Sequence, residues 1–183
     1  MAKQISVFGG ASPEPASAAY LTAHELGQLL GKAGLTVLTG GYMGTMEAVS
    51  RGASEANGHV IGVTCQQIED WRSVGANSWV AEEWRCITLQ ERLDKLVKNC
   101  DAAIALPGGI GTLLEISLIW NQLAIKTLEP KPLILIGSEW HQIMETIFTE
   151  LNAYIPIENR EMIFFAPDPP GAMMLLSHFL QIA

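Results

Sequence analysis

The sequence predicts an α/β fold in which a doubly wound parallel sheet is flanked by helices. Short apolar runs alternate with segments of helical periodicity along all 183 residues, the pattern of parallel strands joined by crossover helices. Glycine-rich turns follow three of these runs, as expected where a strand leads directly into a helix. No repeat, linker or low-complexity segment interrupts the alternation. We therefore expect one Rossmann-like domain over residues 1–183.

The predicted elements follow in order along the chain. The apolar runs predict strands at residues 5–8, 35–38, 59–63, 102–106, 133–136 and 162–165. Apolar residues at helical spacing predict helices at residues 16–32, 43–57, 89–99, 111–125, 139–151 and 169–180. Gly34 and Gly58 end the first two helices. The helix at 111–125 is apolar nearly all round, which favours burial in a dimer interface.

Residues 64–88 do not fit this alternation. They contain Trp71, Trp79 and Trp84 among polar residues, with weak periodicity. A long irregular stretch in a compact domain is often a functional loop or lid. The alternative is a short helix followed by a strand.

Composition limits the classes of partner. Hydrophobic residues make up 49% of the chain and charged residues 16%, so part of the apolar surface is expected in a homodimer or a higher homo-oligomer. The net charge of −8 disfavours nucleic acids and anionic membranes as partners. No apolar stretch approaches the roughly 20 residues that span a bilayer, and the N-terminus lacks a signal-peptide pattern.

Cysteine and histidine usage point to a cytoplasmic protein without a metal. Cys65, Cys86 and Cys100 are widely spaced and form no CxxC pair, which favours reduced thiols. The four histidines have no metal-ligand spacing. We expect no structural metal and no cofactor.

The stretch most informative about function is DAAIALPGGIGTLLE, residues 101–115. A buried strand, a glycine turn and a helix N-terminus make an anion site, because the glycines admit an anion to the backbone and the first helical N–H groups point at it. Glu115 is expected in the first turn of that helix. Its carboxylate would then reach whatever the anion carries.

Two further glycine turns are expected at the same edge of the sheet. Gly9 and Ser12 follow the first strand, and Gly40, Gly41 and Thr45 follow the second. Ligands of doubly wound sheets bind outside the carboxyl ends of the strands. Three such turns predict a cleft for a phosphorylated small molecule, and so a nucleotide-phosphate-binding domain.

Two common phosphate motifs are excluded. A P-loop needs Lys and then Ser or Thr after its last glycine, whereas Thr112 and Leu113 follow Gly111. The dinucleotide fingerprint GxGxxG fails because the first strand ends in GGAS and Leu114 stands where the third glycine is required.

The segment PGGIGTLLE at 107–115 resembles the PGGxGTxxE signature of the Lonely Guy (LOG) family, once described as lysine decarboxylases. TGGYMGTMEAVSRGA (39–53), HVIGVT (59–64) and LQERLDKL (89–96) extend the resemblance through most of the chain. The resemblance implies a phosphoribohydrolase that cleaves the N-glycosidic bond of a nucleoside 5′-monophosphate, of the cytokinin-riboside or AMP type, to a free base and ribose 5-phosphate. It also implies a Rossmann-like homodimer or larger assembly.

The resemblance assigns roles to particular residues. The family's catalytic glutamate and arginine fall on Glu115 and Arg92, and the 5′-phosphate site falls on Gly108, Gly109, Gly111 and Thr112. Glu115 would stabilise the oxocarbenium-like ribose or orient water or a ribose hydroxyl. Arg92 would stabilise the phosphate or the leaving group. The chain departs from the family pattern at Leu89 and Leu93, which replace the usual methionine and lysine around the arginine, and at Thr45 and Glu47 in the second turn.

Each assignment has a structural alternative. Thr112-Leu-Leu-Glu115 also matches a capping box, in which Glu115 only binds the backbone of Thr112. Arg92, among Glu91, Asp94 and Lys95, also fits a solvated helix face. The alternative at the level of function is a binding protein, because molybdenum cofactor carriers resemble the same fold and phosphate motif without catalysing a reaction. Lysine decarboxylase activity is disfavoured, because no lysine is placed to form a Schiff base with a pyridoxal cofactor.

Overall fold

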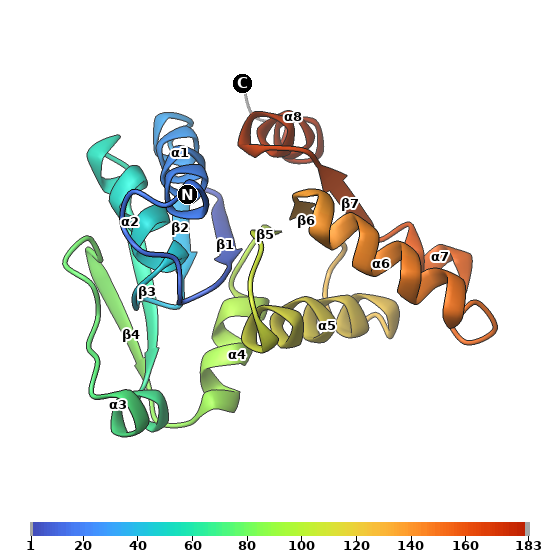
Figure 1. Cartoon of the computed structure of the whole chain (residues 1–183), viewed down its shortest axis with the longest axis horizontal. Helices are drawn as coiled ribbons and strands as arrows, with labels where there is room; N and C mark the ends of the chain where they lie inside the picture. Colours follow the sequence, from blue (N-terminus) through green and yellow to red (C-terminus); the bar gives the residue numbers. More distant parts are fainter. Residues whose placement is uncertain (1, 182–183) are drawn as a thin grey trace.

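The computed structural model describes residues 2–181 and shows a seven-stranded sheet in which every strand pairing is parallel (Figure 1). The strand order is β4-β3-β2-β1-β5-β6-β7, so the direction of winding reverses between β1 and β5. This is the predicted doubly wound α/β fold. The strands are β1 (Gln4–Phe8), β2 (Thr36–Thr39), β3 (Val60–Cys65), β4 (Glu82–Cys86), β5 (Ala102–Ala105), β6 (Leu133–Ile136) and β7 (Ile163–Ala166).

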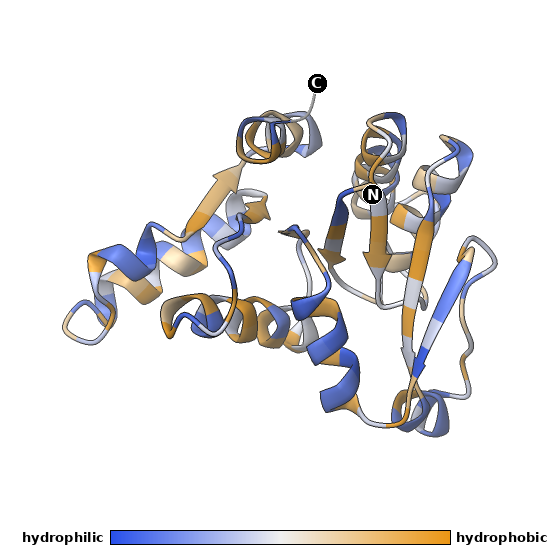
Figure 2. Cartoon of the chain, turned by 180° about the vertical axis from the view of Figure 1, so that it is seen from behind, coloured by the Kyte–Doolittle hydropathy of each residue, from blue (hydrophilic) through white to orange (hydrophobic). Residues whose placement is uncertain are grey.

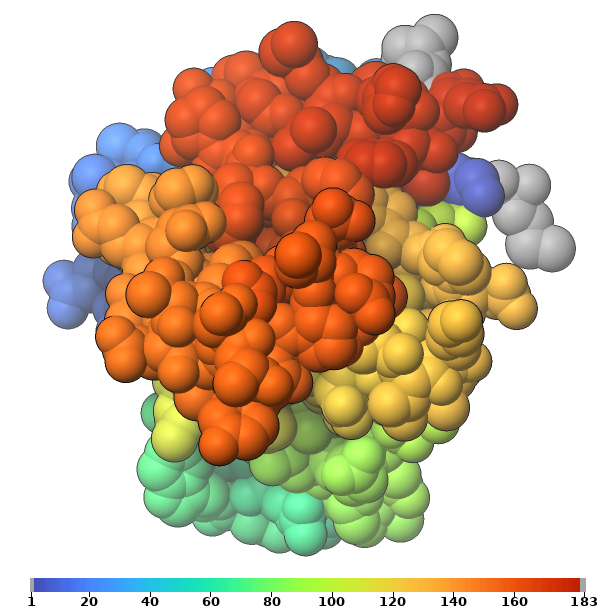
Figure 3. Space-filling view, turned by 90° about the vertical axis from the view of Figure 1, so that its right-hand side faces the viewer, coloured from blue at the N-terminus to red at the C-terminus, as the bar shows by residue number. Residues whose placement is uncertain are grey.

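Helices cover both faces of the sheet, and each face has its own core (Figure 1). One core packs α1, α2 and α8 on the sheet, and the other packs α4, α5 and α6. Figure 3 shows the last third of the chain, in orange and red, covering much of one side of the molecule. The helices are α1 (Ala18–Lys32), α2 (Thr45–Glu55), α3 (Gln66–Arg72), α4 (Leu89–Lys98), α5 (Ile110–Ala124), α6 (Ser138–Glu150), α7 (Ile157–Arg160) and α8 (Pro169–Leu180).

The segment at residues 64–88 forms the short helix and strand that were the simpler alternative. The helix is α3, and the strand is β4, which pairs with β3 from Ile61↔Glu82 to Cys65↔Cys86. β4 is an edge strand whose side chains are mostly exposed, and Figure 2 shows it largely hydrophilic beside the apolar β3. This polarity explains the weak sequence signal, because an exposed edge strand needs few apolar residues.

The four-residue helix α7 was not predicted. Cys65, Cys86 and Cys100 are buried free thiols, which agrees with the expected reduced cysteines. Within residues 2–181, every helix is too short or too polar to cross a bilayer.

Candidate functional site

A cavity of about 460 Å³ opens at the carboxyl ends of β1, β2 and β5, next to the point where the winding of the sheet reverses. Its size is in the usual range for small-molecule sites. This is the edge at which doubly wound sheets bind ligands. The lining residues fall within five segments, residues 7–12, 40–46, 68–74, 89–93 and 109–115.

The three glycine turns meet at this edge, as predicted. The N–H of Gly10 donates to the carbonyl of Pro107 at 3.3 Å, which joins the first turn to the third. The N–H and the hydroxyl of Thr45 both donate to the carbonyl of Gly10, at 2.9 and 3.0 Å, which joins the second turn to the first. The turns therefore form one connected floor.

The N-terminus of α5 opens onto this floor. Gly109 is its N-cap residue and has no side chain to cap the helix. A Cβ atom at Gly109 or Gly111 would meet no atom within 4 Å. The N–H of Leu113 donates to the carbonyl of Gly109 at 3.0 Å and is the first of the helical hydrogen bonds. The N–H groups that precede it have no carbonyl partner within the helix. Uncapped N–H groups at the positive end of a helix form an anion site.

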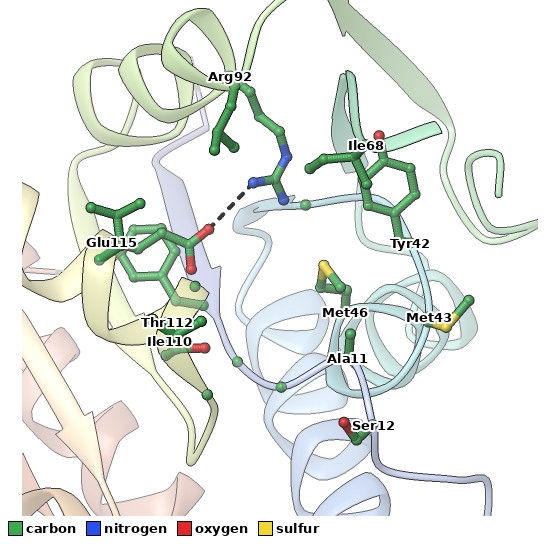
Figure 4. Close-up of a pocket in the computed structure, with 18 of the residues that line it drawn as sticks. Ala11, Ser12, Tyr42, Met43, Met46, Ile68, Arg92, Ile110, Thr112 and Glu115 are labelled. Atoms are coloured by element: carbon green, nitrogen blue, oxygen red, sulfur yellow. Dashed lines mark ion pairs between the residues drawn. The ribbon is translucent and has the colours of Figure 1, made fainter. Parts of the chain in front are cut away.

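Arg92 of α4 and Glu115 of α5 face each other across the floor of the cavity (Figure 4). Arg92 Nη1 lies 3.5 Å from Glu115 Oε1, and the two side chains are only 7% and 10% exposed. Arg92 Nε donates to the carbonyl of Val63 at 2.8 Å. Its guanidinium carbon lies 5.8 Å from the centre of the Tyr42 ring. These contacts fix a buried cation beside a buried carboxyl.

Burial raises the pKa of Glu115 to about 7, and the Arg92 charge only partly opposes this rise. Removal from water penalises the ionised form, whereas a nearby cation favours it. The carboxyl therefore exchanges its proton near neutral pH. Groups perturbed in this way by burial and a specific partner cluster at functional sites.

The capping-box interpretation of Glu115 is wrong. The helix begins at Ile110 after the N-cap Gly109, so Glu115 lies in the second turn and turns toward Arg92. A capping box does exist nearby, at Thr88 and Glu91, where the Thr88 hydroxyl accepts the Glu91 N–H at 3.2 Å and the Glu91 carboxylate accepts the Thr88 N–H at 3.2 Å.

The solvated-face interpretation of Arg92 is also wrong. Its neighbour Glu91 is exposed, but Arg92 itself is 6% exposed and points inward. Adjacent residues of a helix point in different directions, so the charged neighbours of Arg92 in sequence do not share its environment.

Most of the expected site residues line the cavity. Gly9, Ser12, Gly40, Gly109, Gly111, Thr112, Arg92 and Glu115 do so. Three do not. Thr45 binds the carbonyl of Gly10 behind the first turn, Gly108 packs against Thr112 and Gly10, and the carbonyl of Gly41 accepts an amide N–H of Asn77 at 3.0 Å. These three shape the turns from behind.

Sequence reasoning missed one wall of the cavity. Ile68, Trp71, Arg72 and Val74 line it from α3 and the loop that follows. Tyr42, Met43 and Met46 of the second glycine turn and the start of α2 also line the cavity. Glu47 does not line it, and its carboxylate accepts from the Tyr20 hydroxyl at 3.4 Å. The sequence signal for the missed wall was the irregular, tryptophan-containing segment 64–88, interpreted as a functional loop or as a short helix and strand, with no single residue assigned to the site.

Fold and site together define a Rossmann-like α/β protein with a cavity at the carboxyl edge of its sheet, where doubly wound folds bind ligands. The chain belongs to the LOG family, since the model of the SLOG cluster4 family matches residues 2–161.

Two relatives agree with this family assignment, and a solved structure shares the fold. The chain is 28% identical to a probable cytokinin riboside 5′-monophosphate phosphoribohydrolase of Oryza sativa subsp. japonica (LOGL9), over 98% of this chain and 80% of the relative. It is 30% identical to the cytokinin riboside 5′-monophosphate phosphoribohydrolase LOG3 of Arabidopsis thaliana, over 90% and 77%. Among solved structures, the molybdenum cofactor binding protein of Rippkaea orientalis matches with a TM-score of 0.77 and 26% identity, over 97% of both chains.

Proposed function

We propose that the protein hydrolyses the N-glycosidic bond of a nucleoside 5′-monophosphate, of the cytokinin-riboside or AMP type, and releases the free base and ribose 5-phosphate. The observation that carries the proposal is the buried Arg92–Glu115 pair, 3.5 Å apart, in a cavity that the N-terminus of α5 also enters. Water is the co-substrate, and the proposal needs no cofactor.

The helix α5 supports a defined placement of the substrate. The 5′-phosphate binds at the N-terminal N–H groups, beside Gly109, Gly111 and Thr112. Glu115 lies five residues beyond Ile110, about 7.5 Å along the helix axis at 1.5 Å per residue. A ribose bound through its phosphate at the helix end then extends toward the carboxyl of Glu115. Binding energy from the phosphate positions the reacting carbon.

The chemistry follows from the charges that develop. The bond between the ribose C1′ and the base nitrogen breaks, the ribose becomes oxocarbenium-like, and the base leaves with the bonding electrons. Ionised Glu115 stabilises the positive ribose and accepts a proton from the attacking water, whose oxygen bonds to C1′. The base gains a proton from solvent as it leaves, and Glu115 returns to solvent the proton that it took from the water. Arg92 stabilises the negative charge on the phosphate or the base.

Relatives support the same class of ligand. Those named as cytokinin riboside 5′-monophosphate phosphoribohydrolases act on a phosphorylated nucleoside. We also propose a homodimer or higher homo-oligomer, because Ile110, Leu113 and Leu114 of α5 are 88%, 39% and 44% exposed, although Ile110 and Leu114 also line the cavity. Contiguous exposed apolar residues mark interaction surfaces. A cytoplasmic location is proposed because Cys65, Cys86 and Cys100 are free thiols.

The rival function is a carrier of a phosphorylated pterin. The match to the Rippkaea orientalis molybdenum cofactor binding protein, which extends over 97% of both chains, favours it. A carrier needs only a phosphate-binding site, whereas hydrolysis also needs an acid–base group beside the ligand. The raised pKa of Glu115 therefore favours catalysis.

The deciding experiment is incubation of the purified protein with AMP, other nucleoside 5′-monophosphates and cytokinin riboside 5′-monophosphates, with chromatographic detection of the free base. We expect base release from at least one nucleotide, and none from the nucleoside that lacks the phosphate. No release from any nucleotide, together with tight binding of a phosphorylated pterin, would establish the carrier.

A further inference from the structure

The cavity has two chemically different ends. The floor contains the glycine turns, the N-terminus of α5 and the Arg92–Glu115 pair. The outer wall on the side of α3 is mostly apolar: Ile68, Trp71 and Val74 line it, together with the charged Arg72. A ligand with a charged phosphate at one end and an aromatic base at the other matches this division.

Trp71 is the unusual residue of this wall. It lines the cavity and is 73% exposed. α3 contributes no buried residue to either core, so Trp71 is not held there by packing against the sheet. A large exposed aromatic side chain beside a cavity marks a binding surface.

The position of α3 is nevertheless fixed at its start. The Tyr42 hydroxyl accepts the N–H of Cys65, the N-cap residue of α3, at 2.6 Å and donates to the Cys65 carbonyl at 3.1 Å. The N–H of Leu89 donates to the Gln67 side chain at 2.8 Å. α3 is thus tied to the second glycine turn and to α4, the helix that contains Arg92.

One side of the Trp71 indole is already occupied. The guanidinium carbon of Arg72 lies 4.4 Å from the centre of the ring, a cation–π contact. Ile68, three residues before Trp71, lies on the same face of the helix, and Figure 4 shows it beside Tyr42, across the cavity from Glu115. An aromatic ring that enters above Ile68 can stack on the indole surface left open.

We propose that Trp71 is the base-binding residue of this site: the aromatic base of a nucleoside 5′-monophosphate stacks on its indole while the phosphate occupies the N-terminus of α5. This inference rests on the proposed function and adds a base-binding residue to it. Stacking on a π face is tolerant of base identity, so Trp71 provides affinity for aromatic bases as a class.

The test compares Trp71→Ala with Trp71→Phe in binding titrations. Calorimetry with each of the four common nucleoside 5′-monophosphates and with ribose 5-phosphate separates the base from the phosphate. For Trp71→Ala we expect nucleotide affinity to fall about tenfold or more, with ribose 5-phosphate affinity unchanged. Trp71→Phe retains a ring and should keep most of the affinity. Tyr154→Ala is the matched control, because Tyr154 is an exposed aromatic residue, 81% exposed, outside the cavity lining.

Kinetics and fluorescence add independent readouts. Stacking that is equal in the ground and transition states raises KM and leaves kcat unchanged, so Trp71→Ala should change KM alone. A nucleotide, but not ribose 5-phosphate, should quench a fluorescence component that Trp71→Phe lacks.

Several results would overturn the proposal. The proposal fails if Trp71→Ala binds nucleotides as tightly as the wild type, whether or not its oligomeric state changes. It also fails if Trp71→Ala loses affinity for ribose 5-phosphate as much as for nucleotides, or if the wild type binds no nucleotide. If nucleotides bind through Trp71 but no base is released, the base-binding role stands and the proposed hydrolysis fails.

Discussion

The guanidinium of Arg92 occupies the space that a side chain at position 40 would need. A Cβ atom at Gly40 would overlap Arg92 Nη2 and would also lie close to the sulfur of Met46. The second glycine turn therefore makes room for the cation that faces Glu115. This turn contributes to the site in two ways: its backbone lines the cavity, and its lack of a side chain leaves room for Arg92.

Substitution of this glycine should displace the arginine. For Gly40→Ala we expect base release to fall by about tenfold or more, because Arg92 loses its aligned position. Overpacking should lower the free energy of unfolding by about 1–3 kcal/mol. Steady-state kinetics and urea unfolding measure the two effects. Gly75→Ala is the control, since a Cβ there would meet no atom within 4 Å. Full activity in Gly40→Ala would show that the position of Arg92 is unimportant.

Glu115→Gln should abolish turnover and remove a pH-dependent instability. We expect base release to fall by at least about 100-fold, with an unchanged circular dichroism spectrum.

The pKa of Glu115 is raised to about 7 in the folded protein, so folding favours its protonated form. The wild type therefore loses stability as pH rises from about 4.5 to about 7, whereas Glu115→Gln does not. Relative to the wild type, the variant should gain up to about 3 kcal/mol over this range.

Urea unfolding at pH 5 and pH 8 measures this difference. Glu91→Gln is the control whose effect on stability should be the same at both pH values, because hydrogen bonds from the Ile87 and Thr88 N–H groups lower the pKa of Glu91 and place its titration below this range. The stability that Glu91 contributes is present above its unfolded pKa and is lost as pH falls through the folded pKa. An equal pH response in wild type and Glu115→Gln would contradict the buried-carboxyl account.

The rate of base release should depend on the ionisation of Glu115. We expect kcat/KM to rise with pH and to level off above about 7, since the ionised carboxylate is the active form. Arg92→Gln should lower the rate and move this rise to higher pH, because Arg92 holds the pKa of Glu115 down. pH–rate profiles of both proteins test this. If the two profiles have the same midpoint, Arg92 does not influence the pKa of Glu115.

Gly111 and Gly108 should respond to alanine in opposite ways. A methyl group at Gly111 enters open space within the first turn of α5. Gly111→Ala should raise stability by up to about 1 kcal/mol and weaken the binding of ribose 5-phosphate. Gly108→Ala places its methyl group against the Thr112 hydroxyl and should destabilise the fold by about 1–3 kcal/mol. Thermal unfolding and calorimetry distinguish them. Unchanged phosphate binding in Gly111→Ala would place the phosphate elsewhere.

The architecture could be predicted because the strands are buried on both faces of the sheet. β5 and β6 are entirely buried, so they appear in the sequence as continuous apolar runs. β4 could not be resolved in the same way, because it lies at the edge and is mostly exposed. Local polarity there reflects its position in the sheet, which only the assembled fold defines.

The site could be predicted only in part. Glycine turns and the residues of PGGIGTLLE are local signals, and most of these residues line the cavity. The contact between Arg92 and Glu115 joins two helices, so neither local pattern contained it. The choice between a cap and a buried carboxyl at Glu115 depends on the residue at which α5 begins. α5 begins at Ile110, after Gly109, which has no capping side chain, and this start is two positions before the threonine that suggested a cap.

The order of the strands in the sheet also bears on synthesis of the protein. Among residues 2–181, none beyond Glu115 lines the cavity, and strands β1 to β5 are neighbours in an unbroken five-stranded block. A ribosome therefore releases every wall of the cavity before β6, β7 and α8 emerge. Until β6 pairs with β5, the nascent chain has an open strand edge directly beneath the glycine turns. That edge is where premature termination would leave the chain prone to aggregation.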